Sequence, residues 1–299
     1  MGMAISAVSA QAAVYSSIQL SVTKPQTQAG DGLLNKTEIL LSCMFLNDSE
    51  EMIKRSHITS DTIIINQCDE DGYKEEHIGD AFVRTFSVKE RGLTKSRNLA
   101  ISKSVADVCI ICDDDEVFSQ GYEEAVQNAY SSLPQADIII FDMAGRPHKW
   151  GDSIKKLGYR DIMSVSSWQI TFRREKLLAK GIRFDENMGA GSGNGAEEEF
   201  RFLTQCRKVG LKIYHYPYEL ATVAQTQSTW FKGFDREFFV NRGNTTRYIM
   251  GLPLSVLYAA YYAFAKRKQL TDISMFKAFS YTLAGIKENR LNKLKKGNN

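Results

Sequence analysis

Short apolar runs alternate with longer, more polar stretches along most of the chain. From residue 38 onward, several runs of β-branched, aromatic and thiol side chains predict strands. Some of them are apolar at nearly every position, which is typical of strands buried on both faces of a sheet. The predicted strands are EILLSCMFL (38–46), DTIIINQ (61–67), AFVRTFSV (81–88), DVCIIC (107–112) and DIIIFDM (137–143).

Helical patterns fill the gaps between the later strands. Residues 93–106 bring Leu93, Ala100 and Ile101 onto one face, and residues 119–133 begin with Ser119 as a candidate N-cap. Strands that alternate with helices predict an α/β fold with a mostly parallel, doubly wound sheet.

The pattern changes after residue 144. A strand entering a helix is expected over 164–178, and a glycine-rich stretch at 184–210 runs into a helix at 197–209. Residues 211–223 again resemble a strand, and the chain from about 226 is aromatic, basic and mainly helical. We therefore expect three parts: a poorly structured N-terminal tail (1–36), one α/β domain (37–225) and a helical C-terminal region (226–299).

Composition and charge place the chain among ordinary globular proteins. It has 299 residues, of which 43% are hydrophobic and 24% charged, and its net charge of +3 gives no reason to expect a nucleic-acid partner. Its five cysteines are scattered, which suits buried reduced thiols in a cytoplasmic protein. Cys109 and Cys112 form a C-x-x-C without the second pair that a zinc site needs.

Three adjacent carboxylates, Asp113, Asp114 and Asp115, follow the predicted strand 107–112. In a doubly wound sheet, ligands bind outside the carboxyl ends of the strands, so this triplet is expected in a binding crevice. Two carboxylates spaced i, i+2 can bind one Mn²⁺ or Mg²⁺, whose shell a diphosphate completes. A solvated turn is the competing interpretation; an EF-hand is excluded because the central glycine is missing.

Four features in order along about 37–231 resemble the inverting, metal-dependent glycosyltransferases of family 2, which have the GT-A fold. They are Asp69 in NQCDEDGY, the segment ERGLTKSRNLAI (90–101), the D-x-D in CDDDEVF, and GAGSGNGAEEEFRFLTQCRKVGLKIYHYP (189–217). The resemblance implies a GT-A, Rossmann-like fold of a mostly parallel sheet flanked by helices, here with a helical C-terminal appendage. It also implies that Asp113 and Asp115 bind the metal.

The resemblance assigns a donor nucleotide site to the first half of the chain. Gly92 permits close backbone approach, and the helix start after it favours a phosphate. Lys95 and Arg97 can add charge-assisted contacts, although Arg97 as a solvated helix residue is an open alternative. The expected donor-binding residues are Asp69, Arg91, Gly92, Lys95, Arg97, Asn98, Asp113 and Asp114.

A second acidic triplet, Glu197–Glu199, supplies the candidate catalytic base. A sugar hydroxyl needs a carboxylate to remove its proton, and the family's acidic pair falls on Glu198 and Glu199, with the base on Glu199. At the position of the base this chain has Glu where the family more often has Asp, and the third Glu makes the alignment to the family's pair ambiguous. Glu198 is therefore the alternative candidate for the base. Carboxylates that only stabilise a helix N-terminus are the plainer interpretation.

Acceptor contacts are expected from Trp168, Gly191 and Trp230, because aromatic faces suit sugar rings and the glycine lies in the family's acceptor loop. Packing is the alternative for Trp168. His215 is a candidate third metal ligand, but a lone histidine between tyrosines is more often a packed residue.

The C-terminal segment GLPLSVLYAAYYAFAKRK (251–268) is shorter than a comfortable membrane span and fits an interfacial or core helix. The last residues are strongly basic, which fits either a solvated tail or peripheral contact with the inner face of the cytoplasmic membrane.

These observations predict a cytoplasmic enzyme of polysaccharide or glycoconjugate synthesis. It would transfer a sugar, with inversion, from a nucleotide-sugar donor, UDP-linked by preference, to a saccharide or lipid-linked saccharide hydroxyl. The alternatives are a metal-dependent nucleotidyltransferase, which the glycine-free CMFLNDSEEM after the first strand disfavours, and a catalytically silent nucleotide-sugar-binding protein.

Overall fold

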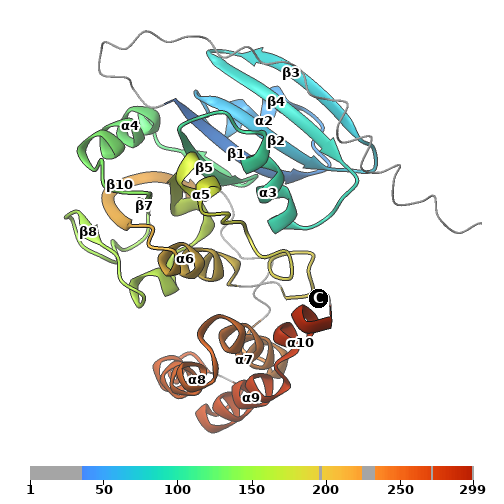
Figure 1. The fold of residues 1–299 in the computed structure, drawn as a ribbon, viewed down its shortest axis with the longest axis vertical. Helices are drawn as coiled ribbons and strands as arrows, with labels where there is room; N and C mark the ends of the chain where they lie inside the picture. The colour runs from blue at the N-terminus through green and yellow to red at the C-terminus, as the bar shows by residue number, and fades with distance from the viewer. Residues whose placement is uncertain (1–35, 195–196, 224–232, 271, 298–299) are drawn as a thin grey trace, which may run out of the picture. The chain divides into compact units, whose positions relative to one another are not determined.

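The apolar runs pair side by side in one mixed sheet (Figure 1). The computed structural model describes residues 36–194, 197–223, 233–270 and 272–297, and in this part of the chain the sheet has ten strands in the order β3-β4-β2-β1-β5-β9-β7-β10-β6, with β8 paired to β10. The strands are β1 (Thr37–Met44), β2 (Asp61–Gln67), β3 (Gly72–Ile78), β4 (Ala81–Val88), β5 (Val108–Asp113), β6 (Glu116–Phe118), β7 (Ile138–Met143), β8 (Lys155–Lys156), β9 (Ile170–Arg173) and β10 (Ile213–Val223).

The central pairings are parallel. β1 pairs in parallel with β2 and β5, β2 with β4, and β7 with β10. Antiparallel pairings join β3 to β4, β9 to both β5 and β7, and β10 to β6 and β8. Because β1, β2, β4 and β5 run in one direction, their carboxyl ends share one edge of the sheet.

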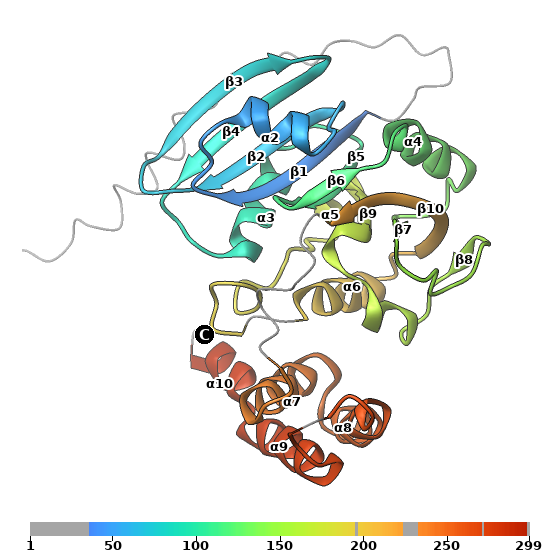
Figure 2. The same cartoon turned by 180° about the vertical axis from the view of Figure 1, so that it is seen from behind.

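Helices flank both faces of the sheet. The flanking helices are α2 (Ser49–Arg55), α3 (Leu93–Lys103), α4 (Tyr122–Ser132), α5 (Arg174–Ala179) and α6 (Glu198–Lys208), with 3-10 turns η1 (Asp161–Ser164) and η2 (Ser167–Gln169). The C-terminal helices α7 (Arg236–Met250), α8 (Leu252–Lys266), α9 (Met275–Glu288) and α10 (Arg290–Gly297) lie beside this domain as a separate group. Figures 1 and 2 show α2 and α3 on opposite faces.

Successive side chains of a strand point to opposite faces of the sheet, and an apolar core covers each face, which explains why the apolar runs are continuous. In β2, Ile63 and Ile65 join the core under α3 and α6, whereas Ile64 joins the core under α2 and α4. All three isoleucines are fully buried, so both faces of the strand are covered by apolar layers at its centre. This is the physical basis of the continuous hydrophobic pattern.

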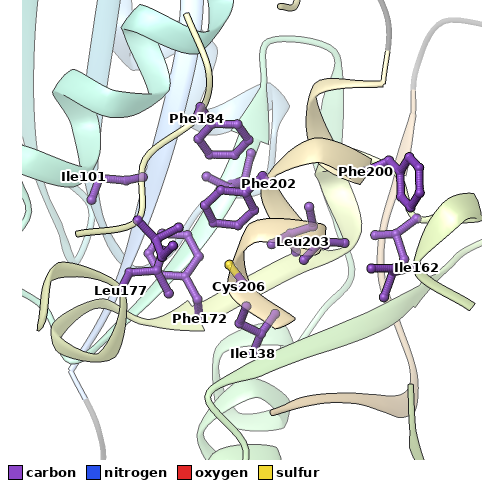
Figure 3. Close-up of a cluster of buried hydrophobic side chains, with 14 of the residues drawn as sticks. Ile101, Ile138, Ile162, Phe172, Leu177, Phe184, Phe200, Phe202, Leu203 and Cys206 are labelled. Carbon is purple, nitrogen blue, oxygen red and sulfur yellow. The ribbon is translucent and has the colours of Figure 1, made fainter. Parts of the chain in front are cut away.

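The side chains of α6 anchor the helix to the sheet. Phe202 stacks on Phe184 with ring centroids 4.2 Å apart, and Leu203 and Cys206 are fully buried in the same cluster (Figure 3). The helix is therefore held by its apolar face, which fixes the position of its first residues at the carboxyl edge of the sheet.

The C-terminal helices pack against one another through close backbone contacts. A Cβ added at Gly243 of α7 would lie 2.1 Å from the carbonyl oxygen of Thr282 in α9, and one at Gly285 would lie 2.0 Å from that of Val240. Only glycine allows two helix backbones to approach so closely.

Several boundaries differ from the sequence expectations. Helix α4 begins at Tyr122 with Gly121 as N-cap, not at Ser119, whose carbonyl accepts a hydrogen bond from the Tyr122 N–H instead. The helix expected over 93–106 ends at Lys103. The expected N-terminal tail lies outside the described residues. Among the helices described, none has the length and apolar character needed to cross a bilayer.

Candidate active site

The acidic cluster and the expected nucleotide contacts lie at the carboxyl edge of the sheet. Asp113 is the last residue of β5, and Asp69 follows β2 by two positions. Since β1, β2 and β5 are parallel neighbours, these residues lie at the same edge of the sheet, where the strand directions predict ligand binding.

Arg97 is the centre of this cluster. Its Nη2 donates hydrogen bonds to both oxygens of Asp113, at 2.9 and 3.1 Å, and its Nη1 lies 3.4 Å from Oε1 of Glu198 and 3.6 Å from Oε1 of Glu199. One guanidinium from α3 thus joins the carboxylate at the end of β5 to both carboxylates at the start of α6. The two acidic triplets, distant in sequence, meet at this side chain.

Burial makes these contacts strong. The side chain of Arg97 is fully buried, and those of Glu198 and Glu199 are 8% and 16% exposed. Burial alone would lower the pKa of Arg97, but Asp113, Glu199 and Glu198 together raise it above its ordinary value. Arg97 therefore stays charged and offsets the repulsion among the carboxylates.

Glu199 has the perturbed pKa expected of a proton acceptor near neutral pH. Burial, together with the charge of Glu198, raises its pKa to about 8 even though Arg97 acts in the opposite direction. A carboxylate with a pKa near the working pH is well suited to general-base catalysis. Glu198 lies against the same guanidinium, so both candidates are placed at the cluster.

Glu197 of the second triplet points elsewhere. It adopts the left-handed conformation, with φ 69°, as N-cap of α6. Its carboxylate pairs with Arg242 at 2.9 Å and accepts a hydrogen bond from the hydroxyl of Thr245 at 2.6 Å, both on α7. The third glutamate thus links α6 to the C-terminal helices.

The first triplet meets the chemical requirements of a hard divalent cation. Burial and the charge of Asp113 raise the pKa of Asp115, which indicates negative charge that the nearby groups do not fully neutralise. In the described part of the chain, no group of three or more Asp, Glu, His or Cys residues is arranged to hold a metal. Asp113 and Asp115 carry carboxylate oxygens, the donors that Mn²⁺ and Mg²⁺ prefer, and Mg²⁺ typically takes only one or two protein carboxylates. Their role as metal ligands stays a prediction.

Other residues of this turn support it. The Asp113 N–H donates to Oε1 of the buried Glu116 at 2.7 Å, and the hydroxyl of Ser167 donates to Asp113 Oδ2 at 3.0 Å. The carbonyl of Asp114 accepts a hydrogen bond from Arg55, while the Asp114 side chain is exposed. The turn that carries the D-x-D is thus held from several sides.

The glycine-rich loop packs on the start of α3. Gly191, with φ +84°, lies so close to Gly92 that an added Cβ would be 3.2 Å from the Gly92 Cα. The carbonyl of Ala190 accepts the N–H of Leu93 at 3.0 Å, and Gln67 accepts the N–H of Gly92 at 2.7 Å. The backbone N–H groups of Gly92 and Leu93, at the helix start that was expected to bind a phosphate, therefore already have hydrogen-bond partners within the protein.

Asp69 and Arg91 form an open pair at the same edge. Arg91 lies 2.8 Å from Asp69 Oδ1, and the Asp69 side chain is 83% exposed, so its carboxylate is accessible to a ligand. Arg91 also donates to the carbonyls of Cys68, Val88 and Lys89, which ties together the ends of β2 and β4.

The remaining expected donor contacts have partners within the protein. Lys95 pairs with Glu90 at 2.8 Å on the surface. Asn98 is buried, and its amide both donates to the carbonyl of Phe184 and accepts from the Phe184 N–H. In the structure, the side chain of Asn98 binds the backbone of Phe184, and that of Arg97 binds the carboxylates of the cluster.

The structure describes one of the two expected acceptor tryptophans. Trp168 lies in η2, directly after the Ser167 that donates to Asp113, and is half-buried. Trp230 lies outside the described residues. His215 is fully buried, with Nε2 3.0 Å from Asp142 Oδ2 and Nδ1 3.3 Å from the carbonyl of Ser153.

Phe45 is a candidate that the sequence interpretation missed. It follows β1 at the carboxyl edge, is 54% exposed, adopts φ 49°, and stacks under the guanidinium of Arg91 at 5.2 Å. A half-exposed aromatic ring beside Asp69 and Arg91 offers a flat face to a nucleobase. The sequence does not reveal the backbone conformation of Phe45. Its position directly after the first strand is the one sequence signal that could have identified it as a candidate.

Solved structures are similar to this chain in fold. TarS from S. aureus, residues 1–349 with UDP-GlcNAc, matches with a TM-score of 0.53 and 13% identity over 82% of this chain and 75% of that one. The same protein with UDP gives a TM-score of 0.52 at 13% identity, over 77% and 73%. The mannosyltransferase PcManGT from Pyrobaculum calidifontis, in complex with GDP-Man and Mn²⁺, gives 0.50 at 13% identity, over 90% and 91%.

The fold is that of the GT-A glycosyltransferases. This confirms the predicted class, a mostly parallel sheet flanked by helices with helices appended at the C-terminus. No protein-family model matches the chain, and no curated protein matches it in sequence. Membership of family 2 therefore stays a prediction.

Proposed function

We propose that this chain is an inverting glycosyltransferase of family 2 that transfers a sugar from a nucleotide-sugar donor to a hydroxyl of a saccharide or lipid-linked saccharide. The observation that carries the proposal is the meeting of Asp113 with Glu198 and Glu199 at Arg97, on the carboxyl edge of a GT-A sheet. The turn that we propose binds the cation and the candidate base thereby lie within one cluster.

The donor would bind along the carboxyl ends of β1, β2 and β5. Phe45 and Asp69 are accessible to a nucleoside, and the D-x-D turn can take the diphosphate. When bound at Asp113 and Asp115, Mn²⁺ or Mg²⁺ would neutralise charge on the departing diphosphate. Similar folds carry UDP-GlcNAc, UDP or GDP-Man, so a UDP-linked donor is preferred here and a GDP-linked donor is the comparison.

The base would be Glu199, with Glu198 as its competitor. Its carboxylate takes the proton of the acceptor hydroxyl as the oxygen attacks the anomeric carbon. The new glycosidic C–O bond forms on the face opposite the breaking bond to the diphosphate, which leaves with that bond's electron pair. This direct displacement inverts the anomeric configuration.

The domain boundaries are also a proposal. We assign the transferase domain to residues 37–225, because β10 ends at Val223, and a helical appendage to 226–299, where α7 begins at Arg236. The five cysteines are all free thiols, which supports the reducing cytoplasm as compartment.

Thermal-shift and turnover measurements test the proposal. Wild-type protein should be stabilised by UDP, UDP-GlcNAc or GDP-Man more strongly with Mn²⁺ than without it, by the linkage of binding to unfolding. Asp115→Ala should lose that metal-dependent shift and all transfer, while Glu124→Ala, which removes an exposed carboxylate on α4, should keep both.

Two results would contradict the proposal. Undiminished transfer by Asp115→Ala would remove the metal role of that carboxylate. A wild-type protein that binds the donor but neither transfers nor hydrolyses it, with a panel of saccharide acceptors, would identify the catalytically silent binding protein.

A further inference from the structure

Helix α8 has an inverted distribution of apolar side chains. It buries its small residues, Ser255, Ala259 and Ala263, against the neighbouring helices. It exposes its large apolar ones. These are Leu252 at 49%, Leu254 at 50%, Leu257 at 67%, Tyr261 at 56% and Phe264 at 56% exposed.

The exposed residues form one stripe. Leu254, Leu257, Tyr261 and Phe264 are spaced by three or four positions, so they lie along a single side of the helix. Scattered surface leucines are normal, but a continuous row of large apolar side chains marks an interaction surface. We call the side defined by these four residues the α8 outer face.

The charged side chains of residues 238–270 are all basic. The sequence contains no Asp or Glu from 238 to 270, whereas Lys266, Arg267 and Lys268 follow the stripe directly. The guanidinium of Arg267 lies 3.9 Å from the centre of the Phe264 ring, which places a cation at the end of the apolar row. An occupant that carries negative charge beside an apolar phase would complement both features.

We propose that the α8 outer face docks into the interface of an anionic lipid bilayer. Amphipathic helices with large apolar residues on one face and basic residues beside them lie in the plane of the membrane interface. Helix α8 has fifteen residues, and a span needs about 20, so its length suits an orientation parallel to the surface. Lysine and arginine near an anionic surface add attraction for phospholipid headgroups.

A second copy of the chain fits the face less well. It would bring the same basic cluster and no carboxylate from its own residues 238–270 to pair with it. Anionic headgroups supply the missing negative charge, and the acyl region accepts the leucine and phenylalanine side chains.

The flank of α8 next to this face connects it to the residue before the candidate bases. The Tyr258 hydroxyl accepts a hydrogen bond from Arg242 at 2.8 Å, and the Tyr262 ring lies 4.3 Å from the same guanidinium. Arg242 in turn pairs with Glu197, the residue before Glu198. If the proposed function holds, these contacts link the membrane-docked helix to the residue before the candidate bases; the docking itself does not depend on that function.

Vesicle flotation of the full chain tests the docking. Wild type should bind phosphatidylcholine vesicles that contain phosphatidylglycerol. Leu257→Gln with Phe264→Gln should lower the partition coefficient about tenfold or more, because two large side chains no longer enter the apolar phase. The matched control, Val105→Gln with Leu178→Gln, removes apolar residues that are 59% and 44% exposed on the α/β domain and should bind like wild type.

A charge variant tests the lipid specificity. Arg267→Gln with Lys268→Gln should weaken binding about fivefold for each charge and reduce its sensitivity to salt. Vesicles of phosphatidylcholine alone should bind wild type more weakly than the anionic vesicles.

Three results would overturn the proposal. They are failure of wild type to float with anionic vesicles, equal binding by the Leu257→Gln, Phe264→Gln variant with an unchanged melting temperature, and a wild-type dimer that the same substitutions convert to a monomer. The last would assign the face to a second copy of the chain. Because flotation uses no nucleotide sugar, a failure here leaves the transferase proposal standing, and a failure of transfer leaves this one standing.

Discussion

Arg97 donates from a single nitrogen to both carboxylate oxygens of Asp113, at 2.9 and 3.1 Å, and it does so with its side chain wholly removed from water. The same guanidinium lies against Glu198 and Glu199. The buried guanidinium, shared by carboxylates from two distant segments, fixes the positions of β5, α3 and α6 relative to one another at the candidate active site.

We expect Arg97→Ala to destabilise the fold by about 3–5 kcal/mol, because removing one partner of a buried ion pair leaves uncompensated charge inside the protein. Urea denaturation monitored by circular dichroism measures the change. The matched control is Lys95→Ala on the same helix, whose pair with Glu90 is 37% and 64% exposed and should cost about 1 kcal/mol or less. Equal losses in the two variants would show that the buried cluster contributes nothing beyond a surface pair.

We expect Glu199→Gln to lower kcat by about 10²–10⁴-fold while nucleotide binding stays within a few fold of wild type, because the amide cannot take the acceptor proton. Steady-state transfer assays and nucleotide titration separate the two quantities. Glu198→Gln, at the other carboxylate on Arg97, is the comparison and should retain more turnover. A larger loss of kcat in Glu198→Gln than in Glu199→Gln would assign the base to Glu198.

The raised pKa of Glu199 predicts a pH dependence of stability. Its pKa is about 8 in the fold against an ordinary 4.5, so between these values the folded protein holds a proton that the unfolded chain releases. Stability from this group is therefore lost as the pH rises through that window. Without added metal or nucleotide, wild type should lose more unfolding free energy between about pH 5 and about pH 8 than Glu199→Gln does, by about 1 kcal/mol or more. Parallel losses in the two proteins would argue against the shift.

The helix contact at Gly243 predicts a steric sensitivity in the C-terminal region. Gly243→Ala places a Cβ 2.1 Å from the carbonyl oxygen of Thr282 and 2.9 Å from the backbone nitrogen of Ile286, so α7 and α9 must separate. We expect a loss of about 1–3 kcal/mol, the usual range for overpacking, in thermal or urea unfolding. Gly72→Ala, whose added Cβ meets only the Ser87 Cβ at 3.7 Å, should change stability far less. A Gly243→Ala protein as stable as wild type would mean that the helices separate at little cost.

Polar elements show the limit of pattern analysis. The strands expected at 61–67 and 81–88 coincide with β2 and β4, since burial leaves a strong apolar signal. Edge strand β3 (Gly72–Ile78) went unpredicted because nearly all of its side chains are exposed or half-exposed. Helix α2 was also missed, although Asp48 caps it by accepting the N–H groups of Glu50 and Glu51, a signal that the sequence carried.

By itself the sequence determined a mostly parallel α/β sheet flanked by helices and the place of the aspartate triplet at the carboxyl end of its strand. Those features follow from local periodicity and from the rule that ligands bind at the ends of parallel strands. Tertiary structure alone decided which carboxylates share a partner. Glu197 pairs with Arg242 on α7, whereas Glu198 and Glu199 lie against Arg97. The left-handed backbone of Glu197 at the start of α6 separates these directions, and the arginines that neutralise the charges are distant in the sequence.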